Sequence, residues 1–93
     1  MSFNDTFKAI SNPVRTEILD LLKEKEMTAS EIANHFDLSN PTISHHLNTL
    51  KKCDLVTERK YKNFVIYQIN TSVVEDMMAF LNKLIGGSKN VKS

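Results

Sequence analysis

The sequence predicts a mainly α-helical domain with one β-hairpin in its C-terminal half. In five segments, apolar residues recur at spacings of three and four, which is the period of an amphipathic helix. Between positions 56 and 69, β-branched and aromatic residues replace that period, which indicates two strands. The chain has 93 residues, of which 41% are hydrophobic and 25% charged. This suits one soluble domain, which we expect over 1–87, followed by a flexible polar tail at 88–93.

Three helices are expected in the first 40 residues. Ser2 and Asp5 resemble a capping box that starts a short first helix. Asn12 followed by Pro13 marks the start of the second helix. The capping box Thr28-Ala29-Ser30-Glu31 starts a third helix of about ten residues at Ala29. The apolar positions of these helices are Phe3, Phe7, Ile10, Val14, Ile18, Leu21, Leu22, Ile32, Ala33 and Phe36.

A fourth helix, two strands and a fifth helix complete the chain. After the turn Asp37-Leu38-Ser39, the pair Asn40-Pro41 indicates a helix that runs from Pro41 to about Cys53. The strands are expected at 56–60 and 64–69, with the turn at 61–63, and Asn70-Thr71-Ser72 caps the last helix. Apolar residues form two stripes on that helix, Val73/Met77/Phe80/Leu84 and Val74/Met78/Leu81/Ile85. One small domain covers less than this, so we expect a symmetric dimer to cover the rest.

Helix, three-residue turn, helix and hairpin follow in the order of a winged helix-turn-helix. Ile43, Leu47 and Leu50 suffice to dock the fourth helix, and no acidic residue lies between Pro41 and Cys53. A face that is merely solvated would more often carry Glu, Lys and Gln, because Ser, Thr and Asn are mediocre helix formers. The sequence therefore favours DNA recognition by the helix 41–52. Its polar and basic side chains are Asn40, Thr42, Ser44, His45, His46, Asn48, Thr49, Lys51 and Lys52.

The hairpin tip is basic and is expected to act as the wing over 59–64. Arg59, Lys60 and Lys62 surround Tyr61, where they would contact the sugar-phosphate backbone or a minor groove. The alternative is that these charges only protect an edge strand. Residues 1–40 contain four basic and seven acidic residues, whereas 41–63 contain five basic and two acidic ones. The net charge of +1 thus conceals a basic helix and wing on an acidic scaffold.

The segment from Ala33 to Lys51 resembles the recognition region of ArsR/SmtB-type winged-helix repressors. Ile43-Ser44, His46-Leu47 and Leu50 stand at the family's spacing, and the flanks 7–15 and 18–22 are similar to the family's opening. The resemblance implies a homodimeric transcriptional repressor that binds an inverted-repeat operator, with Ser44, His46 and their neighbours on DNA. It also implies a dimer interface between the first and last helices, at Phe3, Phe7, Val74, Met77, Met78, Leu81 and Ile85.

Departures from the family pattern narrow this expectation. Metal-sensing members carry cysteines in the third helix or Asp/His and His/Glu pairs in the last, and this chain has neither, so we expect no metal and no cofactor. The short length and the Ile43–Leu47 core are most similar to the metal-independent SdpR-type subgroup, autorepressors relieved by a membrane-protein partner. Cys53-Asp54-Leu55 replaces the family's Ala-Gly-Leu, so Asp54 must end the helix without glycine's conformational freedom. The wing also lacks its usual glycine.

The same residues bear on other classes of function. The single cysteine excludes an internal disulfide. Cys53 is either a redox or ligand switch, if Lys51 and Lys52 lower its thiol pKa, or a small buried hydrophobe, which we favour. A protein-interaction module that uses the wide last helix is a second function class. No nucleophile–base set or Gly-rich phosphate loop is evident, so no enzyme is expected. Without a membrane-spanning run or signal peptide, we expect a cytoplasmic protein that does not insert into the membrane.

Overall fold

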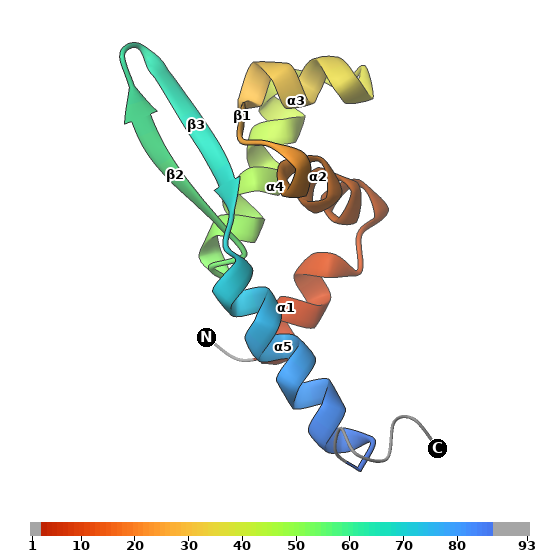
Figure 1. Ribbon diagram of the computed structural model, residues 1–93. Coiled ribbons are helices and arrows are strands. Elements are labelled where there is room, and N and C mark those ends of the chain that lie inside the picture. Colours follow the sequence, from red (N-terminus) through yellow and green to blue (C-terminus); the bar gives the residue numbers. More distant parts are fainter. Residues whose placement is uncertain (1–2, 87–93) are drawn as a thin grey trace.

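The computed structural model describes residues 3–86 and shows a helical body, a projecting hairpin and a terminal helix that leaves the body (Figure 1). The elements follow in the order α1 (Phe3–Ile10), α2 (Pro13–Glu24), β1 (Met27–Thr28), α3 (Ala29–Phe36), α4 (Asn40–Lys52), β2 (Val56–Tyr61), β3 (Phe64–Ile69) and α5 (Thr71–Leu84). The helical fold class with a hairpin, predicted from the sequence, is confirmed. Ser2, whose capping role was predicted, and the tail 88–93 lie outside the described residues.

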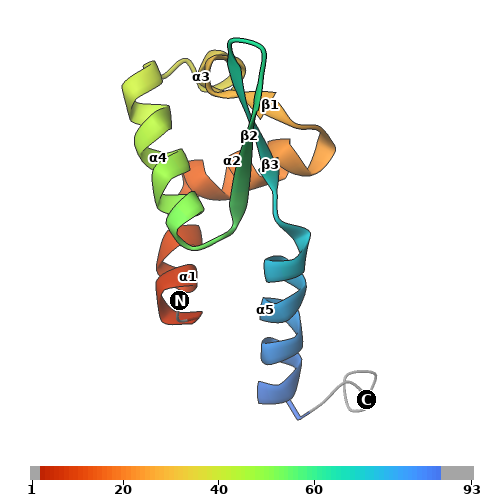
Figure 2. The same ribbon diagram turned by 90° about the vertical axis from the view of Figure 1, so that its left-hand side faces the viewer.

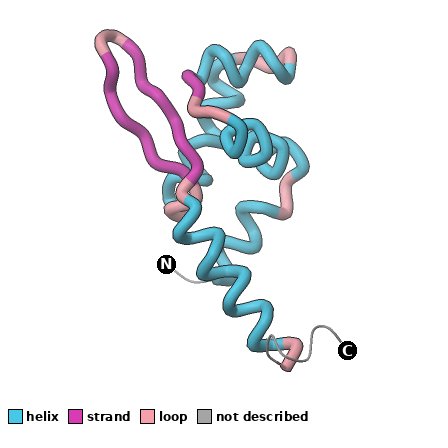
Figure 3. The backbone as a smooth tube through the Cα atoms, in the orientation of Figure 1, coloured by secondary structure: helices cyan, strands magenta, loops and turns pink. Residues whose placement is uncertain are grey.

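The three strands form one antiparallel sheet in the order β1-β3-β2, drawn in magenta in Figure 3. The β2–β3 ladder extends to the pair Tyr61↔Phe64, so the turn is Lys62-Asn63 and the predicted turn 61–63 was one residue too long. β1 was not predicted. It has two residues, Met27 and Thr28, and a pair that short shows no periodicity, so its pairing with β3 depends on tertiary contacts.

Two predicted helix starts are confirmed atom by atom. The Asn12 side-chain oxygen accepts hydrogen bonds from the backbone N–H groups of Val14 (2.8 Å) and Arg15 (3.2 Å) at the start of α2. At the start of α3, Thr28 Oγ1 accepts from the Glu31 N–H (3.2 Å) and the Glu31 carboxylate accepts from the Thr28 N–H (2.9 Å). Each pair satisfies backbone donors that have no partner within the helix.

Two predicted helix boundaries were wrong. The N-cap of α4 is Ser39, whose Oγ accepts from the Thr42 N–H (3.3 Å), so Asn40 is already the first helical residue. The start of α5 agrees with the prediction, since Asn70 is its N-cap residue, although the Asn70 side chain makes no capping hydrogen bond. α3 has eight residues rather than about ten because Asp37 adopts a left-handed conformation with φ 58° and ends the helix.

The core lies where α4 meets α2, α3 and the base of the hairpin. Ile43, Leu47 and Leu50 are fully buried, so the predicted docking stripe of α4 is confirmed. The other fully buried large side chains are Ile18, Ile32, Leu55 and Val56. α4 is thereby fixed along one side, which leaves its opposite side to solvent.

The end of α4 is closed without glycine, as the sequence predicted. Asp54 has φ 60°, and its N–H donates to the Lys51 carbonyl (2.9 Å). The Leu55 N–H donates to the Leu50 carbonyl (3.0 Å), which completes a Schellman motif. Leu50 and Leu55 are both fully buried, so this turn directs the chain from α4 into β2.

α5 extends away from the body, at the same end of the domain as α1 (Figure 2). Met77 is 7% exposed and belongs to the core of the protomer, so it differs from the expected interface position: its side chain is already covered within the chain. Phe7 and Val74 are half-buried against the core. The side chain of Phe3, also predicted at the interface, is not among the side chains that the structure describes. Several large apolar side chains of this arm are open to solvent, namely Met78 (60% exposed), Leu81 (43%), Leu84 (66%) and Ile85 (63%), whereas Val73 and Phe80 are half-buried.

Candidate nucleic-acid interface

The outer face of α4 is polar and basic. Pro41, His45, Asn48 and Lys52 recur at the helical period on the side opposite the buried stripe, and all four are exposed. Of the other residues predicted to contact DNA, Asn40, Thr42 and Lys51 are exposed, whereas Ser44 and Thr49 are half-buried at the flanks of the face. We call the side chains of Ser44, His45, Asn48 and Lys52 the reading face.

Hydrogen bonds within the chain engage only part of this surface. Thr42 bonds to Ser39 (2.9 Å between hydroxyl oxygens), and Asn40 donates to Ser30 Oγ (3.5 Å) at the helix-turn-helix corner. Thr49 Oγ1 donates to the His45 carbonyl (3.2 Å). Within residues 3–86, the side chains of Ser44, His45 and Asn48 make no hydrogen bond, so their donors and acceptors remain available to base edges.

His46 is set apart from the reading face. Its ring is half-buried, and its Nδ1 lies 3.2 Å from Nη1 of Arg15 on α2. Burial lowers the pKa of His46, and the cationic Arg15 and neighbouring His45 lower it further. His45 is exposed, with ring centroids 5.7 Å apart between the two histidines. Adjacent residues on α4 thus face different surroundings, one solvent and the other the scaffold.

The tip of the wing carries two cations and two aromatic rings. Lys60 and Lys62 form no ion pair within the described part of the chain. Tyr61 and Phe64 lie opposite each other in the ladder and are 54% and 57% exposed. The Lys62 ammonium lies 5.4 Å from the centre of the Tyr61 ring, and Lys62 opens the turn with φ 56°. Positive charge and apolar surface are therefore both presented at the tip.

The sequence analysis placed Arg59 at the tip of the wing, but the structure places it outside the tip. It pairs with Ile66 inside the ladder, and its Nη2 donates to the Glu26 carboxylate (2.6 Å). Gln68 donates to the other oxygen of the same carboxylate (2.9 Å). The Arg59 guanidinium is thus committed to the base of the wing, beside the segment that precedes β1.

An ion pair joins the wing to α4. Lys51 Nζ lies 3.2 Å from the Glu58 carboxylate on β2. Tyr67 lies opposite Glu58 in the β2–β3 ladder. Burial raises the pKa of Tyr67, and the negative charge of Glu58 raises it further. Lys51 therefore orients the hairpin relative to the reading face as well as adding positive charge near it.

Cys53 is the C-cap residue of α4, and its surroundings do not favour the reactive thiolate form of its side chain. The side chain is 6% exposed, and its Sγ donates to the Asp5 carbonyl at 3.6 Å. Burial raises the pKa of the thiol, and the carboxylates of Asp5 and Asp54 raise it further. The expected lowering by Lys51 and Lys52 is not found. Arg15 alone opposes the rise, so the thiolate is disfavoured.

The comparisons with known proteins agree with this geometry. Residues 12–58 match the model of bacterial regulatory proteins of the arsR family. The chain belongs to this family. It is 49% identical over 84 residues to the transcriptional repressor SdpR of Bacillus subtilis (strain 168), covering 86% of this chain and 93% of that repressor. It is 41% identical over 91 residues to the arsenical resistance operon repressor of Staphylococcus aureus, covering 92% and 88% of the two chains.

Solved structures support the same assignment. A crystal structure of a possible transcriptional regulator for arsenical resistance superposes with a TM-score of 0.78 at 30% identity, over 86% of this chain and 83% of that one. The homodimeric winged helix-turn-helix domain of Mb0332 from Mycobacterium bovis superposes with a TM-score of 0.75 at 28% identity, over 89% and 77%. The ArsR-family chain is therefore a winged helix-turn-helix protein, a DNA-binding transcriptional repressor and not an enzyme.

The described part of the chain contains neither a cluster of metal-ligating side chains nor a helix suited to cross a membrane. Within residues 3–86, no group of three or more His, Cys, Asp or Glu side chains is arranged to hold a metal ion. Over the same residues, no helix combines the length and the hydrophobicity that crossing a membrane requires.

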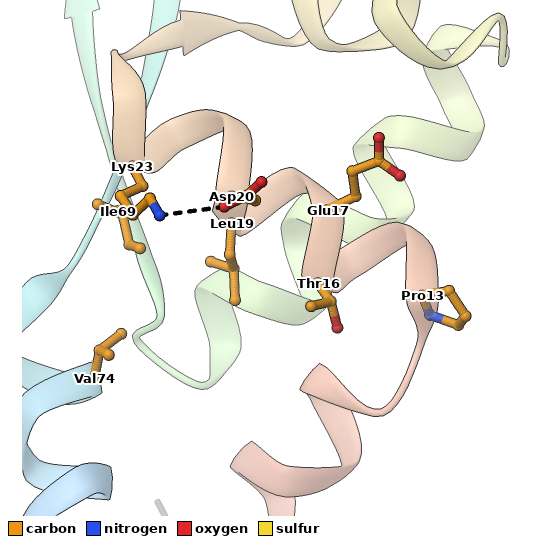
Figure 4. A pocket seen from close by; sticks show the side chains of 8 residues that line it. All are labelled: Pro13, Thr16, Glu17, Leu19, Asp20, Lys23, Ile69 and Val74. Atoms are coloured by element: carbon orange, nitrogen blue, oxygen red, sulfur yellow. Dashed lines mark ion pairs between the residues drawn. The ribbon is translucent and has the colours of Figure 1, made fainter.

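A groove of about 620 Å³ lies between α2, the end of β3 and α5, beside the Asp20–Lys23 ion pair (3.4 Å, Figure 4). Its lining residues are Pro13, Thr16, Glu17, Leu19, Asp20, Lys23, Ile69 and Val74, none of them on α4.

Proposed function

We propose that this ArsR-family repressor binds a palindromic operator as a homodimer, with the reading face of α4 in the major groove and the wing on the flanking backbone. The domain spans 1–87. The observation that carries the proposal is the reading face itself, where Ser44, His45 and Asn48 are unbonded within residues 3–86 and no carboxylate lies on α4. Such groups distinguish base pairs by hydrogen bonds in a groove about 12 Å wide.

The homodimer is supported by the apolar arm. Met78, Leu81, Leu84 and Ile85 expose apolar surface on a helix that has left the body of its own protomer (Figure 2). A two-fold dimer through α5 and α1 removes that surface from water. It also places two copies of α4 at a fixed separation, and half-sites about one helical turn of DNA apart, roughly 34 Å, match such an arrangement.

Regulation is the finer part of the proposal. We infer that the repressor acts on its own promoter in the cytoplasm and is relieved by a partner, a membrane-protein antirepressor, rather than by a metal. The likeness to the transcriptional repressor SdpR supports repression. Autorepression is what the resemblance of the Ile43–Leu47 core to the SdpR-type subgroup implies. The buried Cys53, with its raised pKa, favours a structural role over redox relief.

Selection from a random pool of DNA duplexes by the purified chain tests the proposal without knowledge of the operator. We expect an inverted repeat with half-sites about 10 bp apart. His45→Ala and Asn48→Ala should each weaken binding to the selected duplex by about 5- to 150-fold, because one base contact contributes about 1–3 kcal/mol of discrimination. Ser72→Ala, an exposed polar substitution at the start of α5, is the matched control and should bind as the parent does.

Each alternative gives a different result. An enriched motif without inverted symmetry, bound by a monomer, would contradict the homodimer. If no motif is enriched and the chain instead retains a protein partner through α5, the protein-interaction module is the better reading. A duplex from the upstream region of the chain's own gene, compared with the selected duplex, tests autorepression separately.

A further inference from the structure

A basic hollow lies beside the C-terminal half of α4, on the flank that faces away from the wing. α1 lies next to the end of α4, and α2 borders both (Figure 2). The hollow between these three helices has a volume of about 380 Å³. It is lined by Asp5, Lys8, Ala9, Arg15, Thr49, Lys52 and Cys53. Thr49 and Lys52 were predicted as part of the recognition helix, whereas the residues from α1 and α2 were not assigned any contact with DNA.

Arg15 is held in place at this hollow. Its Nε donates to the Ala9 carbonyl at 2.6 Å, and its Nη1 donates to His46 Nδ1 at 3.2 Å. These two bonds leave Nη2 without a partner among the described residues. A guanidinium fixed on one edge with its other nitrogen unpaired is a preorganised donor for an oxyanion.

Two lysines add charge from separate helices. Lys8 on α1 and Lys52 on α4 are exposed, and neither forms an ion pair within residues 3–86. Asp5 contributes the one carboxylate of the lining, so three cations outweigh one anion. The hollow therefore attracts a negatively charged group. The flexible lysine side chains can reach such a group even though their ammonium groups are not held in fixed positions.

The position of the hollow indicates the source of that group. Lys52 belongs both to the hollow and to the reading face, four residues after Asn48. On the other flank of α4, Lys51 is tied to the wing through Glu58. A duplex on the reading face has one phosphate backbone on each side of its major groove, so a wing on one side leaves the hollow to the other.

We propose that Lys8, Arg15 and Lys52 bind a backbone phosphate of the operator and clamp the duplex opposite the wing. This inference rests on the proposed function, because it requires DNA on the reading face. It adds α1 and α2 to the DNA contacts, although neither carries a residue that reads bases. Such a contact fixes register and contributes affinity without sequence preference.

Salt dependence of DNA binding tests the clamp. The probes are the duplex selected by the parent chain and a mixed-sequence duplex, titrated by fluorescence anisotropy between about 50 and 200 mM KCl. Lys8→Gln and Lys52→Gln should weaken binding to both duplexes by the same factor, and each should reduce the slope of log K against log salt by about one. Lys23→Gln removes the same charge at the groove of Figure 4 and should leave affinity and slope unchanged.

A neutral methylphosphonate placed at successive positions of the duplex locates the contact. At one phosphate position in each half-site, the methylphosphonate should weaken DNA binding by the parent chain. At that position it should leave DNA binding by the Lys8→Gln variant unchanged. Parent-like slopes for both lysine variants, with operator binding intact, would overturn the clamp and leave the proposed function standing. If inorganic phosphate raises the Tm of the parent but not of Lys8→Gln while both slopes stay parent-like, the hollow holds a free anion, and the DNA clamp is equally overturned. Failure of the parent to bind any duplex would instead contradict the proposed function.

Discussion

Arg15 and His46 connect the scaffold to the recognition helix through one hydrogen bond, from Nη1 of Arg15 to Nδ1 of His46 at 3.2 Å. Arginine has donors and no acceptor, so His46 must accept at Nδ1 and carry its proton on Nε2. Because Arg15 also donates to the Ala9 carbonyl at the end of α1, the contact links three helices. A protonated His46 would place two donors and two positive charges face to face.

The first prediction follows from that conflict. The pKa of His46 in the folded chain is below its ordinary value of about 6.5, through burial first and then Arg15. The unfolded chain therefore binds the proton at higher pH than the folded chain. The contribution of this residue to stability is complete above about pH 6.5, falls as the pH drops towards the folded pKa, and levels off below it.

His46→Asn is the matched variant, because an amide oxygen still accepts from Arg15 but does not titrate. Urea unfolding of both proteins from pH 8 to pH 5 measures the difference in free energy of unfolding. We expect this difference to shift against the parent as the pH falls below about 6.5. A pH-independent difference would show that His46 does not titrate differently in the folded and unfolded states.

Asp54 gives a second prediction. It adopts φ 60° in the Schellman motif at the end of α4, a conformation that glycine takes without steric cost. We expect Asp54→Gly to raise the free energy of unfolding by about 0.5–1 kcal/mol, measured by urea denaturation. Thr57→Gly is the control: it lies within β2 and should destabilise the chain, because glycine weakens a strand interior. Equal losses in both variants would contradict the strain assigned to Asp54.

The third prediction concerns the wing turn. Lys62 has φ 56° as the first residue of the two-residue turn, whereas Asn63 is not among the residues with positive φ in the described chain. Lys62→Gly should therefore stabilise the hairpin by up to about 1 kcal/mol, and Asn63→Gly should not. The same Lys62→Gly variant should bind DNA more weakly, because the tip loses a cation. Thermal unfolding and anisotropy on one sample separate the two effects.

Local chemistry explains which parts of the fold were predictable. Asn12 and the Thr28–Glu31 capping box predict helix starts because each capping side chain lies within three residues of the backbone N–H group that it binds. The two-residue β1 was missed because its partner, Tyr67, is far away in sequence. The start of α4 was placed one residue late because Asn-Pro and Ser39 offer competing caps, and only the bond from the Thr42 N–H to Ser39 decides between them.

In the candidate site, too, features set by local sequence were predictable, and features that depend on distant residues were not. The stripe of Ile43, Leu47 and Leu50 predicts which side of α4 is open, because helical period alone sets it. The bonds from Arg59 to Glu26 and from Arg15 to His46 escaped prediction, because the two residues of each pair lie more than 30 positions apart in sequence. The basic hollow has the same origin: Lys8, Arg15 and Lys52 come from three helices, and no spacing in the sequence brings them together.

The fourth prediction separates the two roles considered for Cys53. With its side chain 6% exposed and its pKa raised by burial, the thiol should react with a disulfide reagent such as DTNB much more slowly than a free thiol at pH 8. The rate should approach that of a free thiol in denaturing urea. Treatment with peroxide should leave operator binding unchanged. Fast modification of the folded chain, with loss of binding, would restore the redox-responsive interpretation.

The last prediction uses opposite sides of α5. Leu81 is 43% exposed on the apolar side, between Met78 and Ile85 at the helical period, whereas Ala79 is exposed on the polar side near Glu75 and Asp76. Leu81→Lys places a charge where a symmetric partner would repeat it, so sedimentation at micromolar concentration should show monomer and operator affinity should fall. Ala79→Lys adds the same charge beside two carboxylates and should leave the dimer intact. Circular dichroism of both variants should match the parent, because Leu81 lies outside the buried core of the protomer. If Leu81→Lys remains dimeric, the exposed face of α5 is not the surface through which two chains associate.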